Sequence, residues 1–140
     1  MSTEQNKSIV RRWIEEGWNK GDVTVIDQLY APNYVQHEPV PETVNSAAAL
    51  KQYVGMYVSA FPDLHFTIED LLAEGDKVVW RFKSTAHQTG PFMGMPPTGK
   101  TGNITGIVIF RLENSRIVEG WVNIDVLGLL QQVGIIPAMA

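Results

Sequence analysis

The chain has 140 residues, of which 44% are hydrophobic and 19% charged, and its formal net charge is -4. This composition is typical of a folded globular domain, so residues 1–140 are expected to form a single domain. The sequence has no cluster of basic residues and no cysteine, which argues against nucleic acid or an anionic membrane surface as a partner and excludes disulfides and thiolate chemistry.

The N-terminal residues lack the apolar core of a signal peptide, and no later run approaches the roughly 20 apolar residues of a membrane-spanning helix. We therefore expect a cytoplasmic protein. Over the first 60 residues, apolar side chains recur every three or four positions, which predicts amphipathic helices over residues 3–20, 22–29 and 46–60. Asp22 is expected to cap the second helix, and Pro32 prevents its continuation.

Residues 33–41 contain two prolines and are predicted to form an extended loop that carries Tyr34 and His37. After residue 63 the hydrophobic period changes to two, which predicts strands over residues 64–73, 76–87, 103–113 and 116–125. Short turn segments between them indicate antiparallel hairpins. The Gly- and Pro-rich loop of residues 89–100 carries Phe92, Met93 and Met95, and we expect these side chains to fold over something. A last helix is predicted over residues 126–132.

Helices followed by antiparallel strands are typical of the α+β class. If the helices cover only part of a strongly curved sheet, a closed cavity remains between the helices and the sheet. We therefore expect an apolar small-molecule ligand as the partner.

The last predicted strand has two different faces. Glu119, Trp121, Asn123 and Asp125 alternate with a set that contains Val118, Val122 and Ile124. We expect the half-polar set to form a cavity wall, in which apolar neighbours would raise the pKa of Asp125 toward that of a general base. The alternative is that Asp125 only caps the final helix. The aliphatic set is expected to pack in a homodimer.

Other candidates are less specific. Trp80 and Arg81 lie on opposite faces of the second strand, and the period does not decide which face meets the cavity. Arg81 would orient a ligand carbonyl or, more simply, pair with Glu119. The three histidines, His37, His65 and His87, lack the spacing of a metal site. His37 and, less clearly, His87 are placed to reach the cavity mouth.

The chain resembles the SnoaL-like polyketide cyclases of the NTF2-like superfamily, and the resemblance spans nearly the whole sequence. The segments that carry it are residues 34–39, 61–63, 87–100 and 117–132, of which the last is the most specific. The resemblance implies a cone-shaped α+β fold and an aldol-type ring closure of a polyketide ester without a metal or cofactor. Asp125 matches the family's acid/base aspartate, assisted by His37.

The resemblance also implies that His37, Trp121 and Asn123 are wall residues that position the ligand. Together with the candidates from the strand and loop patterns, the predicted substrate-binding residues are Tyr34, Trp80, Arg81, His87, Trp121 and Asn123. The family's second polar group is often a histidine on the neighbouring strand. Here that strand has no histidine: one face carries Asn103, Thr105, Ile107, Ile109 and Arg111, and the other face is mostly apolar. The alternatives are a non-catalytic module that binds a small molecule, or an isomerase or epoxide hydrolase of the same superfamily. A hydrolase would require Glu119 beside Arg81.

Overall fold

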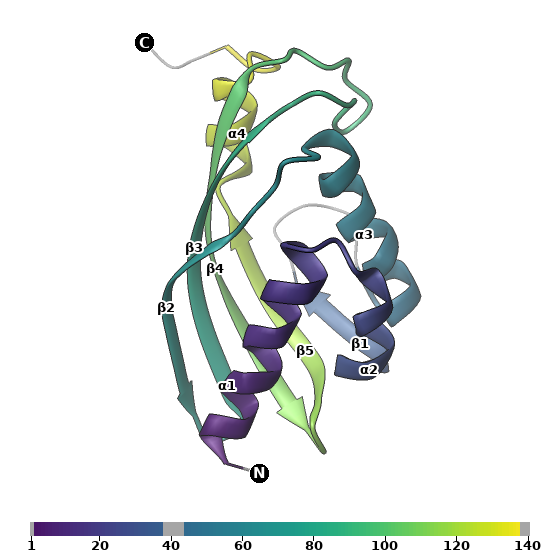
Figure 1. Ribbon diagram of the computed structural model, residues 1–140, viewed down its shortest axis with the longest axis vertical. Coiled ribbons are helices and arrows are strands. Elements are labelled where there is room, and N and C mark those ends of the chain that lie inside the picture. Colours follow the sequence, from purple (N-terminus) through teal and green to yellow (C-terminus); the bar gives the residue numbers. More distant parts are fainter. Residues whose placement is uncertain (1, 38–43, 138–140) are drawn as a thin grey trace.

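The computed structural model describes residues 2–37 and 44–137. Its elements are α1 (Thr3–Arg12), α2 (Ile26–Leu29), β1 (Tyr30–His37), α3 (Ala47–Ala60), β2 (Thr67–Glu74), β3 (Lys77–His87), β4 (Thr101–Glu113), β5 (Arg116–Ile124) and α4 (Val126–Gln132). The strands form one sheet in the order β1-β5-β4-β3-β2. Figure 1 shows α1, α2 and α3 on one side of β2, β3 and β4, with α4 near the C-terminal end of the chain. The predicted α+β class is confirmed.

All neighbouring strands are antiparallel except β1 and β5, which run parallel. The prediction of a loop over residues 33–41 is therefore wrong for residues 33–37, which belong to β1, while residues 38–41 lie outside the described part of the chain. Pro32 obscured the strand, since proline donates no ladder hydrogen bond. It is tolerated here because β1 is an edge strand, and the register shifts between Tyr30 and Val35.

The predicted first helix changes type half-way along. It is α-helical only to Arg12, and Trp13–Trp18 form a π-helical turn. The Trp13 ring lies so close to the backbone of Gly17 that a Cβ there would be 2.1 Å from a ring carbon. A residue without a side chain is therefore required for this packing. Helix α3 matches its prediction, and the Ser46 hydroxyl caps it by accepting a hydrogen bond from Ala49 N at 3.0 Å.

The four predicted strands are confirmed with small changes at their ends. β2 begins three residues later than expected because the side-chain amide of Asn19 binds both backbone groups of Phe66, accepting from its N at 2.7 Å and donating to its O at 3.1 Å. The turn between β4 and β5 places Asn114 and Ser115 at φ values of 50° and 65°, as a tight hairpin requires.

The core lies between the helices and the inner face of the sheet. Aromatic rings dominate it, with centroid distances of 4.6 Å for Phe66–Phe82 and 4.9 Å for Trp18–Phe66. In the loop of residues 89–100, only Phe92 folds inward and is fully buried. Met93 and Met95 are 50% and 43% exposed, so the expectation that they cover something is wrong. None of the described helices is long and apolar enough to cross a membrane.

Candidate functional site

A small cavity lies between the helices and the inner face of the sheet. Its volume is about 30 Å³, which is enough for a water molecule. The described lining side chains are buried except those of Tyr53 and Ile124, which are half-buried. The lining residues are Trp13, Trp18, Tyr30, Gln36, Leu50, Tyr53, Phe66, Trp80, Phe82, Val108, Phe110, Val122 and Ile124.

The cavity wall contains few polar groups and no acidic or basic side chain among the residues that the structure describes. Gln36 is 3% exposed, and its Oε1 accepts a hydrogen bond from the Tyr34 hydroxyl at 2.9 Å. Burial is the main factor that raises the pKa of Tyr30 well above its ordinary value, followed by the neighbouring Tyr34 and Tyr53. The phenol of Tyr30 is therefore neutral at physiological pH. The indole Nε1 of Trp80 is buried without a hydrogen-bond partner among the described residues.

The two faces of β5 are oriented opposite to the expectation. Val122 and Ile124 line the cavity, whereas Trp121 and Asn123 lie on the outer face of the sheet. The alternation was correct, but the aliphatic set packs against the helices because its burial is the more favourable. The prediction that Val118, Val122 and Ile124 pack in a homodimer is therefore wrong for Val122 and Ile124, which belong to or pack against the core.

Three of the predicted site residues meet in a groove on the outer face. Arg81, Asn123 and Asp125 line a space of about 550 Å³, together with Glu69, Phe82, Lys83, Thr105, Gly106, Ile107 and Ile124. The Arg81 guanidinium pairs with Asp70 at 2.7 Å, not with Glu119 as expected, because Asp70 faces it across the β2–β3 pair. The carboxylate arrangement that an epoxide hydrolase would need beside Arg81 is therefore not formed by Glu119.

Asp125 caps helix α4. Its Oδ1 accepts a hydrogen bond from Gly128 N at 2.9 Å, and the side chain is exposed in the groove. The capping role that the sequence left open is thus present. The expected burial among apolar neighbours is absent, because the strand directs Asp125 away from the core.

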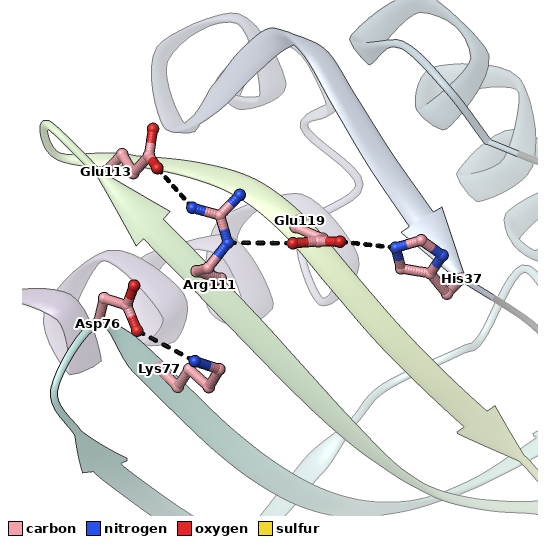
Figure 2. A network of polar contacts seen from close by, with 6 residues as sticks. All are labelled: His37, Asp76, Lys77, Arg111, Glu113 and Glu119. Carbon is pink, nitrogen blue, oxygen red and sulfur yellow. Dashed lines mark hydrogen bonds and ion pairs between the residues drawn. The ribbon is translucent and has the colours of Figure 1, made fainter.

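His37 belongs to a second group of polar residues on the outer face. Figure 2 shows a chain of contacts in which Glu119 lies between His37 and Arg111, and Arg111 also binds Glu113. His37 Nε2 is 2.7 Å from Glu119 Oε2, and Arg111 Nε donates to Glu119 Oε1 at 3.0 Å. These contacts lower the pKa of Glu119, His37 having the larger effect. The imidazole is stacked on Trp121 at a centroid distance of 5.4 Å.

His87 lies apart from both groups, at the end of β3. Its Nδ1 is 2.7 Å from Asp63 Oδ2, and its backbone N donates to the other carboxylate oxygen at 2.9 Å. The hydrogen bond from the His87 side chain is the main factor that lowers the pKa of Asp63. His87 lines neither the cavity nor the groove. Within residues 2–37 and 44–137, no group of three or more His, Asp or Glu side chains is placed to hold a metal ion.

The structure therefore distributes the predicted site over several places. Trp80 lines the inner cavity, and Tyr34 is bonded to the lining residue Gln36. Arg81, Asn123 and Asp125 lie in the outer groove. His37 and Trp121 stack on each other and line neither space. Gln36 and Tyr53 were missed as lining residues. Gln36 was missed because β1 was interpreted as a loop, so its inward position in an alternating strand was not considered.

Comparison with known proteins identifies the family. The sequence profile described as "SnoaL-like polyketide cyclase" matches residues 8–133. The chain belongs to the SnoaL-like polyketide cyclase family. No curated protein gives a significant match.

Solved structures agree with this family and its NTF2-like fold. A proposed SnoaL-like polyketide cyclase from Jannaschia sp. CCS1 is similar with a TM-score of 0.88 and 26% identity, over 96% of this chain and 95% of the other. A proposed polyketide cyclase from Acidithiobacillus ferrooxidans is similar with a TM-score of 0.82 and 30% identity, over 96% of this chain and 99% of the other. AclR, a proposed hydroxylase from Streptomyces galilaeus, is similar with a TM-score of 0.87 and 28% identity, over 99% of this chain and 87% of the other. The structural relatives of this SnoaL-like chain thus carry names that imply more than one chemistry.

Proposed function

We propose that the protein binds a small, mainly apolar molecule of the polyketide type in the inner cavity. The observation that carries this proposal is the lining itself, in which aromatic and aliphatic side chains surround a few neutral polar groups. Ligand sites in proteins have this composition. The relatives named as polyketide cyclases support the class of ligand.

The present volume of about 30 Å³ is far below the 300–1,000 Å³, in round figures, of typical ligand sites. Binding therefore requires the lining to move. Tyr53 on α3 and Ile124 at the end of β5 are the half-buried lining residues, and they are the side chains that a ligand would displace on entry.

Isothermal titration calorimetry with 1-tetralone tests this proposal. Val122→Phe fills the cavity from β5, and its affinity should be about tenfold lower or worse. Leu127→Phe is the matched control, because Leu127 is 52% exposed on α4 and lines neither site. Equal affinities of the two variants, each shown by circular dichroism to be folded, would refute binding in this cavity.

Catalysis of the cyclase type is the second candidate, and the grouping of Asp125, Asn123 and Arg81 in the outer groove favours it. In this mechanism the Asp125 carboxylate removes a proton from a carbon between two carbonyls. The resulting enolate carbon attacks another carbonyl and closes the ring, and the new alkoxide takes the proton back from Asp125. Asn123 and Arg81 would orient the carbonyl oxygens, and His37 would assist from the edge of the face.

The binding function stands first because the inner cavity has no acid or base among its described lining residues. Asp125→Asn separates the two candidates. If the chain is a cyclase, this variant loses turnover of a polyketide ester while it still binds 1-tetralone. If turnover of such esters is absent in the unmodified protein as well, the protein is a binding module.

A homodimer remains part of the proposal, through a different surface from the one predicted. Cross-strand neighbours on the outer face form an apolar row of Leu72, Val79, Ile109 and Trp121. Leu72 is 64% exposed, and Ile107 beside the row is 47% exposed. An exposed apolar row that crosses a sheet favours contact with a second copy, because both copies would bury the same surface.

A further inference from the structure

Trp80, which is among the residues that line the inner cavity, carries a buried hydrogen-bond donor without a partner among the described residues. Trp80 on β3 is 2% exposed, and its Nε1 has no partner among the described residues. An indole N–H can only donate. A buried donor without an acceptor is unfavourable, and buried polar groups in proteins are nearly always satisfied by a partner, a water or a ligand.

The ring of Trp80 is held in place on several sides. Its centroid lies 4.9 Å from that of Phe82, 6.1 Å from Phe66 and 6.3 Å from Phe110. Rotation of the indole toward another partner would disrupt this packing. The acceptor must therefore be supplied by a group that enters the cavity, either a water or a ligand.

The cavity that Trp80 helps to line is the size of one small acceptor atom. The cavity has a volume of about 30 Å³ before any side chain moves, which accommodates an oxygen atom with little beyond it. Among the described lining residues, the other polar side chains besides the indoles are Gln36, Tyr30 and Tyr53. They are neutral, and none of the lining residues in the described part of the chain is a cation. A carboxylate or phosphate would lose its hydration there without a compensating charge. A neutral carbonyl oxygen has no charge to compensate and requires only a hydrogen-bond donor.

We infer that Trp80 Nε1 is the donor to a neutral carbonyl oxygen of the ligand, so that the protein selects ketones or esters over hydrocarbons and carboxylates of the same size. This inference rests on the proposed binding function and specifies its ligand class. Trp80 acts as a specificity-determining residue, and the aromatic and aliphatic lining supplies the remaining affinity.

Three matched ligands test the inference by calorimetry. These are 1-tetralone, tetralin, which lacks the carbonyl, and 1-naphthoate, which is an anion. The unmodified protein should bind 1-tetralone about fivefold more tightly than tetralin, and 1-naphthoate most weakly. Trp80→Phe keeps an aromatic ring but removes the donor, so it should bind 1-tetralone and tetralin equally.

The Trp80 indole signal in a ¹⁵N–¹H spectrum gives a second test, which needs the variant only for assignment. On addition of 1-tetralone it should shift downfield, and tetralin should not produce this shift. Should Trp80→Phe fail to fold, selective ¹⁵N labelling and the response of the unmodified protein decide the matter.

The outcomes are distinguishable. Equal binding of 1-tetralone and tetralin by the unmodified protein would overturn the Trp80 inference and leave the proposed function intact. Retention of the ketone preference by Trp80→Phe would also overturn it. A Trp80 signal that shows contact with water both before and after saturation with 1-tetralone would mean that an ordered water is the acceptor. Failure of both ligands to bind would remove the inference together with the proposed function.

Discussion

His37 Nε2 lies 2.7 Å from Glu119 Oε2, although the two residues are 82 positions apart in the chain. The contact joins the edge strand β1 to β5, the strand with which it runs parallel. Arg111 on β4 holds the second carboxylate oxygen of Glu119, so three neighbouring strands are linked on the outer face. Glu119 thus fixes the position of the histidine that was expected at the cavity mouth.

Glu119→Gln should destabilise the protein at neutral pH and have little effect in acid. His37 and then Arg111 lower the folded-state pKa of Glu119. A carboxyl with a lowered pKa stabilises the fold above its unfolded pKa of about 4.3, and this stability disappears as the pH falls through the folded value. We expect a Tm about 1–3 °C lower at pH 7, with the difference closing below about pH 4.

Thermal unfolding between acidic and neutral pH measures this effect. Glu15→Gln is the control, since Glu15 is exposed on the π-helical turn. A difference between Glu119→Gln and the unmodified protein that stays constant over the whole pH range would contradict the expectation.

The cap of α4 predicts different stabilities for two substitutions of Asp125. Asn keeps an oxygen that can accept from Gly128 N, whereas Ala does not. Asp125→Ala should therefore lower the free energy of unfolding by about 1 kcal/mol, and Asp125→Asn should stay close to the unmodified protein. Urea denaturation gives both values. Equal losses in the two variants would mean that the charge of Asp125, and not its capping oxygen, stabilises the helix.

Two glycines on different elements should respond in opposite directions to alanine. A Cβ at Gly120 in β5 would lie 2.3 Å from the hydroxyl of Tyr34, which is fully buried and bound to Gln36. Gly120→Ala should therefore cost about 1–3 kcal/mol in unfolding free energy. A Cβ at Gly55 in α3 meets nothing within 4 Å, so Gly55→Ala should stabilise by about 0.5–1 kcal/mol. A neutral Gly120→Ala would show that Tyr34 is less constrained than its contacts imply.

The apolar row on the outer face gives a prediction about assembly. Leu72→Glu places a charge on the most exposed member of the row, and it should convert a dimer into a monomer in sedimentation equilibrium. Leu127→Glu, on α4, should leave the mass unchanged. A protein that is monomeric at high concentration before any substitution would exclude the proposed interface.

Much of the architecture could be predicted from local patterns. The bounds of α3 and α4 and the three central strands follow from hydrophobic period, capping residues and turns, all of which act over a few positions. β1 could not be recognised in this way, because its pairing depends on β5, more than 80 positions away, and Pro32 interrupts its pattern. The π-helical turn depends on the contact between Trp13 and Gly17, which apolar spacing does not distinguish from an α-helix.

The site was harder to predict than the fold. The alternation of side chains along a strand separates its two faces, but it does not show which face packs against the core. Asp125, Asn123 and Trp121 were correctly placed on one face of β5, but that face is the outer one. The composition of the two sets indicates which one faces the core, since Val122 and Ile124 offer more apolar surface to bury than Asn123 and Asp125. That Trp80 Nε1 lacks a partner among the described residues could not be predicted, since its position depends on the rings that surround it.

Methyl-resolved NMR of the protein titrated with 1-tetralone tests the central claim most directly, because inner and outer side chains alternate along the same strands. Val108 and Val122 line the inner cavity, whereas Ile107 and Thr105 line only the outer groove. If the ligand binds in the inner cavity, the methyl signals of Val108 and Val122 shift and saturate while those of Ile107 and Thr105 change little. Shifts confined to Ile107 and Thr105, or no saturable shift at all, would contradict it.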